Sequence, residues 1–207
     1  MSSPSPTTVF RVWSLYQALG FIFGWFFHSV ISHLWTGDHL MTLTPAQLLM
    51  HNVSLAGCVL ITLFFQHRAT TRLFNLNLLR YGYLYLFGPT ALFWIGFYLV
   101  GVPADILLWF LAVGLLNGLL ISKALKIRGW LLWSFLSGFV GFLVGALVLY
   151  PLDPYLSSLR GLIAHVIMFT LLGIVAGIPA ALFSGAMLRR ALLTNPLPPA
   201  AVPADLP

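Results

Sequence analysis

Acidic residues, cysteine and charged residues in general are all scarce in this 207-residue chain. It contains four aspartates and no glutamate, which excludes the glutamate-dependent membrane proteases and the common carboxylate-bridged metal sites. Its single cysteine, Cys58, lies in an apolar segment, so an intrachain disulfide and a cysteine-based metal site are also excluded. Charged residues make up 7% of the chain and hydrophobic residues 60%. A water-soluble domain of this size would need far more polar residues to cover its surface.

The hydrophobic residues are gathered in long segments. A helix needs about 20 apolar residues to cross the ~30 Å hydrocarbon layer of a membrane. Six segments meet this requirement: Trp13–Trp35, Gln47–Gln66, Gly82–Val102, Ala104–Ser122, Trp130–Tyr150 and Gly161–Leu188. Tryptophan and tyrosine mark their ends, as is typical of the headgroup region. The sequence therefore predicts an all-α polytopic membrane protein whose six transmembrane helices form three hairpins.

The sign of the few charged residues alternates from one connection between the hydrophobic segments to the next. Three aspartates, Asp38, Asp105 and Asp153, share alternate breaks with Arg160. The other nine basic residues lie near the ends of the chain and in the remaining breaks: Arg11, Arg68, Arg72, Arg80, Lys123, Lys126, Arg128, Arg189 and Arg190. Basic residues are retained on the cytoplasmic side, so we expect both termini there and the protein in the inner membrane or an equivalent internal membrane. They form no run, which argues against nucleic acid and favours anionic lipid headgroups as their partners.

One transmembrane domain accounts for most of the chain. We expect it to cover residues 13–190, between a disordered N-terminus (1–12) and a disordered proline-rich tail (191–207). The connection from Arg68 to Arg80 mixes leucines with basic residues. We expect this connection to be either a short helix that lies in the inner interface of the membrane or a plain loop.

Small residues recur at four-residue spacing inside the segments. Four segments contain Gly-x-x-x-Gly: Gly20/Gly24, Gly114/Gly118, Gly141/Gly145 and Gly173/Gly177. Such pairs form flat strips that let helix backbones approach closely. Packing within one bundle is the favoured interpretation, and a homodimer seam is the alternative. Val113, beside one strip, is expected to face lipid.

Three histidines lie in the outer half of the predicted bilayer. Helical rise places His28, His51 and His165 roughly 6–11 Å below its outer boundary. Gln17 shares a helix face with His28. Because ionisable residues inside a membrane are costly and usually face the bundle interior, we expect these histidines to line one pocket.

The chemistry of such a pocket has several interpretations. Neutral imidazole ligates haem iron, chlorophyll magnesium, copper or zinc, so a bound tetrapyrrole or metal ion is one hypothesis. A small-solute site is the second, and structural hydrogen bonding between helices is the third. Gln17 and Asn117 are further candidate ligand contacts, although a lone intramembrane asparagine commonly joins helices. We predict no catalytic residue, because Gly-x-Ser-x-Gly, His-Glu-x-x-His and Gly-x-Gly-Asp patterns are all absent.

The stretch from Val113 to Gly145 has two glycine-rich helices joined by Lys-Ala-Leu-Lys-Ile-Arg-Gly-Trp. It resembles a group of uncharacterised bacterial multipass proteins, a resemblance that implies no activity. In size, helix number and cytoplasmic ends the chain is similar to the substrate-binding subunits of energy-coupling-factor vitamin transporters, in which a small ligand lies near the outer surface.

We therefore expect a non-enzymatic accessory or binding subunit that holds a small ligand or cofactor in an outer pocket. A solute-uptake component is the alternative, and a purely structural subunit is a further one. Other membrane protein subunits are the expected partners.

Overall fold

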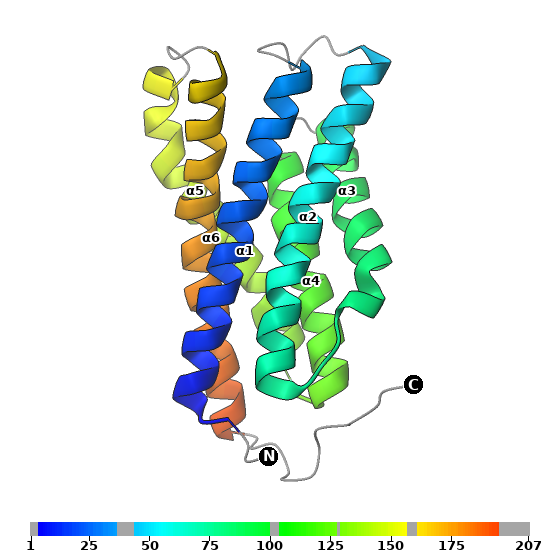
Figure 1. Cartoon of the computed structure of the whole chain (residues 1–207). Helices are drawn as coiled ribbons and strands as arrows, with labels where there is room; N and C mark the ends of the chain where they lie inside the picture. The colour runs from blue at the N-terminus through cyan, green and yellow to red at the C-terminus, as the bar shows by residue number, and fades with distance from the viewer. Residues whose placement is uncertain (1–3, 37–43, 100–103, 128, 157–160, 195–207) are drawn as a thin grey trace.

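The computed structural model describes residues 4–36, 44–99, 104–127, 129–156 and 161–194. These ranges contain six α-helices and one short 3-10 helix but no strand, which confirms the expected all-helical class (Figure 1). The elements are α1 (Pro6–Thr36), α2 (Pro45–Phe74), η1 (Leu79–Tyr81), α3 (Gly82–Leu99), α4 (Ala104–Leu125), α5 (Trp130–Leu156) and α6 (Gly161–Thr194).

The helices have the length and composition of membrane spans. Five of them, α1, α2, α4, α5 and α6, are long and apolar enough to cross a membrane. The sixth, α3, has 18 residues. At 1.5 Å per residue α3 is about 27 Å long, close to the ~30 Å hydrocarbon thickness. Large apolar side chains such as Phe87 and Leu99 are exposed on its surface, as expected for a helix that faces lipid.

Five helices extend beyond their predicted limits, among them α4, which ends at Leu125, and α5, which ends at Leu156. α1 begins at Pro6. Most of the segment 1–12 that was expected to be disordered is therefore helical, from Pro6 onward. α6 continues to Thr194, into the expected tail, and residues 195–207 lie outside the described part of the chain.

The extension of α2 changes the reading of the next segment, because this helix runs past Gln66 to Phe74. It ends because Asn75 adopts a left-handed conformation (φ 55°) and its N–H bonds the carbonyls of Thr70 and Thr71. The segment 68–80 is therefore mainly helix continuing from the span. It is neither a separate interfacial helix nor a plain loop, because its apolar residues pack inward: Leu73, Phe74, Leu76 and Leu78 are all buried.

The six helices form a closed ring. Each packs against the next helix in the chain, and α6 packs against α1. The contact between α6 and α1 is the most extensive, followed by that between α1 and α2, whereas α2 and α3 share the smallest. α1 begins and α6 ends at the same end of the ring, the lower end in Figure 1.

Glycines allow these neighbours to approach closely. A Cβ atom on Gly24 of α1 would lie 2.9 Å from the Cys58 carbonyl oxygen of α2. A Cβ on Gly141 of α5 would lie 2.7 Å from the Ala176 carbonyl oxygen of α6. Gly118 faces α5 in the same way, and the other glycines of the four pairs meet neighbouring helices of this chain: Gly20, Gly114, Gly145, Gly173 and Gly177. All four pairs therefore pack inside one bundle, which leaves these strips covered rather than open to a second copy.

Aromatic side chains fill the interior of the ring. The Trp25 ring of α1 lies 5.1 Å from that of Trp109 of α4, and Phe21 stacks on Phe110 at 5.3 Å, between centroids. Phe169 of α6 stacks on Trp25 at 5.8 Å. We call these five residues the aromatic layer.

Val113 of α4 belongs to the same core. It is 1% exposed, so the expectation that it faces lipid is wrong. Val113 shares with Trp109 and Phe110 the face of α4 that packs into the core of the ring.

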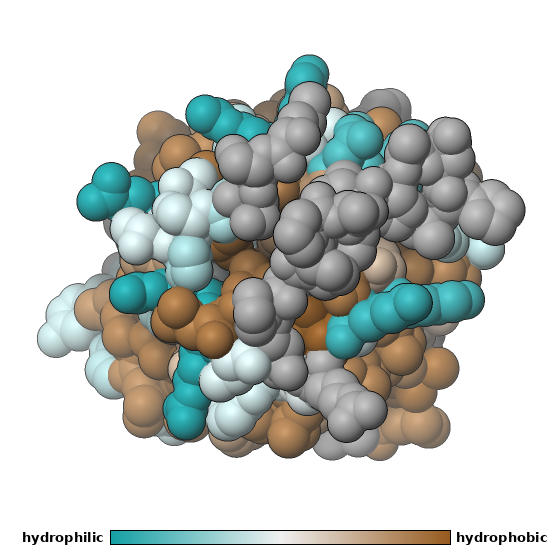
Figure 2. Space-filling view, turned by 90° about the horizontal axis from the view of Figure 1, so that it is seen from below, coloured by the Kyte–Doolittle hydropathy of each residue, from teal (hydrophilic) through white to brown (hydrophobic). Residues whose placement is uncertain are grey.

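The basic side chains gather at one end of the ring. They are exposed and lie near the start of α1, at the ends of α2, α4 and α6, and in η1: Arg11, Arg68, Arg72, Arg80, Lys123, Lys126, Arg189 and Arg190. Figure 2, which looks onto this end, shows hydrophilic residues among apolar ones. The residues Asp38, Arg128 and Arg160 lie outside the described part, as do the side chains of Asp105 and Asp153.

Replacing Gly177 with leucine is expected to destabilise the bundle by about 1–3 kcal/mol, because overpacking forces neighbours apart. The added Cβ would collide with the Cβ of Phe21 on α1. The adjacent Ile178 is 36% exposed, and Ile178→Leu serves as the matched control with little expected effect. Thermal unfolding in mild detergent compares the two variants. Equal stability of both would contradict close packing at Gly177.

Candidate functional site

His28 of α1 and His51 of α2 meet in the interior of the ring. Their ring centroids are 5.0 Å apart with the planes at 75°. His28 is 1% and His51 8% exposed. Aromatic rings surround the pair: Trp25 and Phe169 lie 5.5 and 5.3 Å from His28, and Trp94 of α3 lies 5.9 Å from His51. Both imidazoles are therefore held in a largely apolar environment.

Helix periodicity places this pair at the interior. Gln17, Phe21, Trp25, His28 and Ser32 follow one another at spacings of three or four residues, so they share the face of α1 that points into the ring. The close approach of α2 at Gly24 then brings the adjacent turns of the two helices together.

A serine on the opposite helix contacts each imidazole. Ser54 Oγ lies 2.9 Å from His28 Nδ1, and Ser32 Oγ lies 3.0 Å from His51 Nδ1. Ser54 Oγ also lies 2.7 Å from the His51 carbonyl oxygen, so one hydroxyl contacts both the His28 imidazole and the backbone of α2. A hydroxyl both donates and accepts, which lets it hold the imidazole ring in either tautomer.

A serine at hydrogen-bond distance from a histidine is also the minimal geometry of a nucleophile and its base. Here Ser54 is completely buried, and its Oγ is also within hydrogen-bond distance of the His51 carbonyl oxygen. A hydroxyl enclosed in this way gives a substrate no access, so we assign the contact to orienting the imidazole.

The described interior contains no formal charge. Its buried polar side chains belong to Ser, Thr, Asn, Gln and His, with no Asp, Glu, Lys or Arg among them. The described residues also contain no cluster of three His, Cys, Asp or Glu side chains that could hold a metal ion. Because an uncompensated ion is costly to bury, this interior suits a neutral guest better than a bare metal ion.

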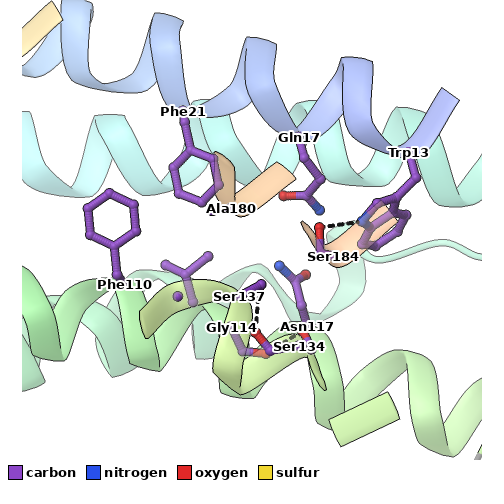
Figure 3. A pocket seen from close by; sticks show the side chains of 12 residues that line it. Trp13, Gln17, Phe21, Phe110, Gly114, Asn117, Ser134, Ser137, Ala180 and Ser184 are labelled. Atoms are coloured by element: carbon purple, nitrogen blue, oxygen red, sulfur yellow. Dashed lines mark hydrogen bonds between the residues drawn. The ribbon is translucent and has the colours of Figure 1, made fainter. Parts of the chain in front are cut away.

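Gln17 and Asn117 lie at a different place from the histidines. They line a small cavity between α1, α4, α5 and α6, together with Ser134, Ser137 and Ser184 (Figure 3). Gln17 is eleven residues from His28, or about 16 Å along α1 toward the basic end. A single pocket containing all the predicted contacts is therefore not what the structure forms.

His165, the third predicted histidine, belongs to α6 four residues before Phe169. Its side chain lies outside the described part of the structure. Along α6, His165 comes one helical turn before Phe169, and the Phe169 side chain contacts His28.

The serine partners Ser32 and Ser54 were not among the predicted site residues. The signal that finds them is spacing, because Ser32 follows His28 by four residues and Ser54 follows His51 by three. Each serine therefore shares a helix face with one histidine and meets the other across the interface.

No family model, curated protein or solved structure matches this chain. The two resemblances suggested by the sequence therefore stay predictions, and a functional proposal has to rest on the geometry described above.

Replacing Ser54 with alanine is expected to cost about 0.5–1.5 kcal/mol, because it removes a buried hydrogen bond to His28. Ser29 is the matched control, since it is equally buried but bonds only the Phe26 carbonyl of its own helix. Ser29→Ala should change the unfolding temperature little. A Ser54→Ala variant as stable as Ser29→Ala would show that the interhelical bond contributes nothing.

Proposed function

We propose that this chain is a non-enzymatic membrane subunit that binds a small, neutral, hydrogen-bonding ligand at the His28–His51 pair. The observation that carries the proposal is the pair itself, two buried imidazoles in contact and each bonded by a serine of the other helix. Ionisable side chains are costly inside a membrane and commonly mark functional sites. Hydrogen bonds between membrane helices use Ser, Thr, Asn, Gln or His, and this chain already uses threonine, glutamine and serine at other contacts.

The environment of the pair supports the proposed class of ligand. Two imidazoles in contact supply polar groups, and the surrounding rings of Trp25, Trp94 and Phe169 supply flat apolar surface, a combination typical of small-molecule sites. A neutral ligand needs no counter-charge in this interior. His165 is the proposed third side chain of the site, and a metal ion or tetrapyrrole is the competing guest.

A solute-uptake component is the second candidate. The observation that favours it is the second polar group, around Gln17 and Asn117, on the same side of α1 as His28. Polar groups at two depths of one bundle suit a molecule that passes from one to the other. Such a component would need an energising partner subunit.

We also propose that the three-hairpin bundle lies in the inner membrane with its basic end in the cytoplasm. The exposed arginines and lysines at the end where α1 begins and α6 ends support this orientation. Reporter fusions after Arg72, Lys126 and Arg190 are expected to report cytoplasm, and fusions near Asp38, Asp105 and Asp153 the opposite side. One clear reversal would refute the topology.

The ligand proposal is tested by isolating the protein from native membranes in mild detergent. Mass spectrometry of an extract should find one small molecule retained by the wild type and depleted about tenfold or more in His28→Gln and His51→Gln, equivalent to at least about 1.4 kcal/mol. His67→Gln is the matched control, because His67 also lies on α2 but is only half-buried, and its imidazole contacts Thr71 of the same helix. Retention by all variants, or no molecule in the wild type, would refute the proposal. A visible chromophore or bound metal would replace it with the cofactor interpretation.

A further inference from the structure

The cavity around Gln17 and Asn117 is built from polar groups of four helices. Its volume of about 10 Å³ is close to the minimum of roughly 10–15 Å³ that one water molecule needs. Phe21 and Phe110 close it on the side of the aromatic layer (Figure 3). It is therefore separate from the proposed ligand site at His28 and His51.

The side-chain amide of Gln17 faces this cavity. Gln66 Nε2 donates to Gln17 Oε1 at 3.1 Å, and Gln17 Nε2 has no hydrogen-bond partner among the described residues. Gln17 is 3% exposed, so this amino group has no access to bulk water. Figure 3 shows the amide pointing toward Ser184 and Asn117. A buried donor of this kind is costly unless it is satisfied.

The serines around the cavity can accept further hydrogen bonds but have no proton left to donate. Ser134, Ser137 and Ser184 donate their hydroxyl protons to backbone carbonyls of Gly114, Ser134 and Ala181, at 2.7, 2.6 and 3.0 Å. Ser184 also accepts from Trp13 Nε1 at 3.0 Å. Each hydroxyl oxygen has two acceptor sites, so these serines offer lone pairs to the cavity but no proton.

We propose that the cavity binds one water molecule, which accepts from the Gln17 amide and donates to serine oxygens of α5 and α6. Water fits because it is small enough and both donates and accepts, whereas an apolar guest would leave the Gln17 amide unsatisfied. An internal water commonly makes two to four such bonds. The water connects α1 to α5, two helices whose described residues do not pack against each other directly.

X-ray hydroxyl-radical footprinting tests this, because radicals formed from a bound water oxidise the side chains beside it. Trp13 and Phe110, which line the cavity and are 1% exposed, are expected to be labelled. Trp109 and Trp130 are 0% exposed and do not line it, so they are the internal controls. Labelling of Trp13 and Phe110 no greater than that of the two controls would overturn the proposal.

Two variants separate the water from the Gln17–Gln66 hydrogen bond. Both Gln17→Met and Gln66→Met remove that bond, but only Gln17→Met removes the amide from the cavity. Labelling of Trp13 and Phe110 is expected to fall several-fold in Gln17→Met and to persist in Gln66→Met, with folding checked by the labelling of Trp109. Persistence in Gln17→Met, or an equal loss in both, would show that the Gln17 amide does not hold a water there.

Discussion

In a bilayer, apolar side chains gain little by contacting one another instead of lipid, so helices associate through close packing and hydrogen bonds. The whole ring depends on backbone approach at glycine. Because Gly24 has no side chain, α2 approaches α1 closely. Gly118 allows the same approach between α4 and α5, and Gly141 between α5 and α6. Gly177 leaves space for the side chain of Phe21. This last contact links packing to the site, because Phe21 lies against α6 and stacks on Phe110 of α4.

Hydrogen bonds within the chain complete the interior, since lipid offers none. Ser134 donates to the carbonyl of Gly114, and Thr62 lies within hydrogen-bond distance of the carbonyls of Gly20 and Cys58. Gly20 and Gly114 are two of the glycines that permit close approach. The polar groups that remain are sorted by depth. The histidines lie toward the end of the bundle opposite to the basic one and the Gln17 cavity toward the basic end, with the aromatic layer between them.

The sequence allows the helices, the glycine strips and the contact between His28 and His51 to be predicted, because each follows from periodicity on one helix or on two consecutive helices. The end of α2 could not be located in this way. Arg68 and Arg72 reach outward while Leu73 and Phe74 of the same turns pack inward, so charge alone suggested a break where the helix continues. Long basic side chains extend from a helix end to the interface without ending the helix.

The separation of Gln17 from the histidines was equally hidden. Periodicity gives the face of a residue, but which groups meet at one depth depends on how α1, α4, α5 and α6 are placed together. The cavity is a product of that placement, and its serines, Ser134, Ser137 and Ser184, look like ordinary span residues in the sequence. Val113 was misplaced for the same reason, since the glycine strip of α4 did not reveal that its neighbouring face also packs inward.

The extent of packing between neighbouring helices varies around the ring. The described residues of α2 and α3 share the least contact of any neighbouring pair, and α3 is the shortest α-helix and contains Pro89. Regions with few packing contacts open at the lowest free energy, so α3 is the helix whose amide protons should exchange first. Trp94 lies on α3, donates to Asn52 of α2 and packs against His51. Detachment of α3 would therefore uncover His51 sideways, toward the hydrocarbon, and a molecule dissolved in the bilayer would reach the histidines without first crossing water.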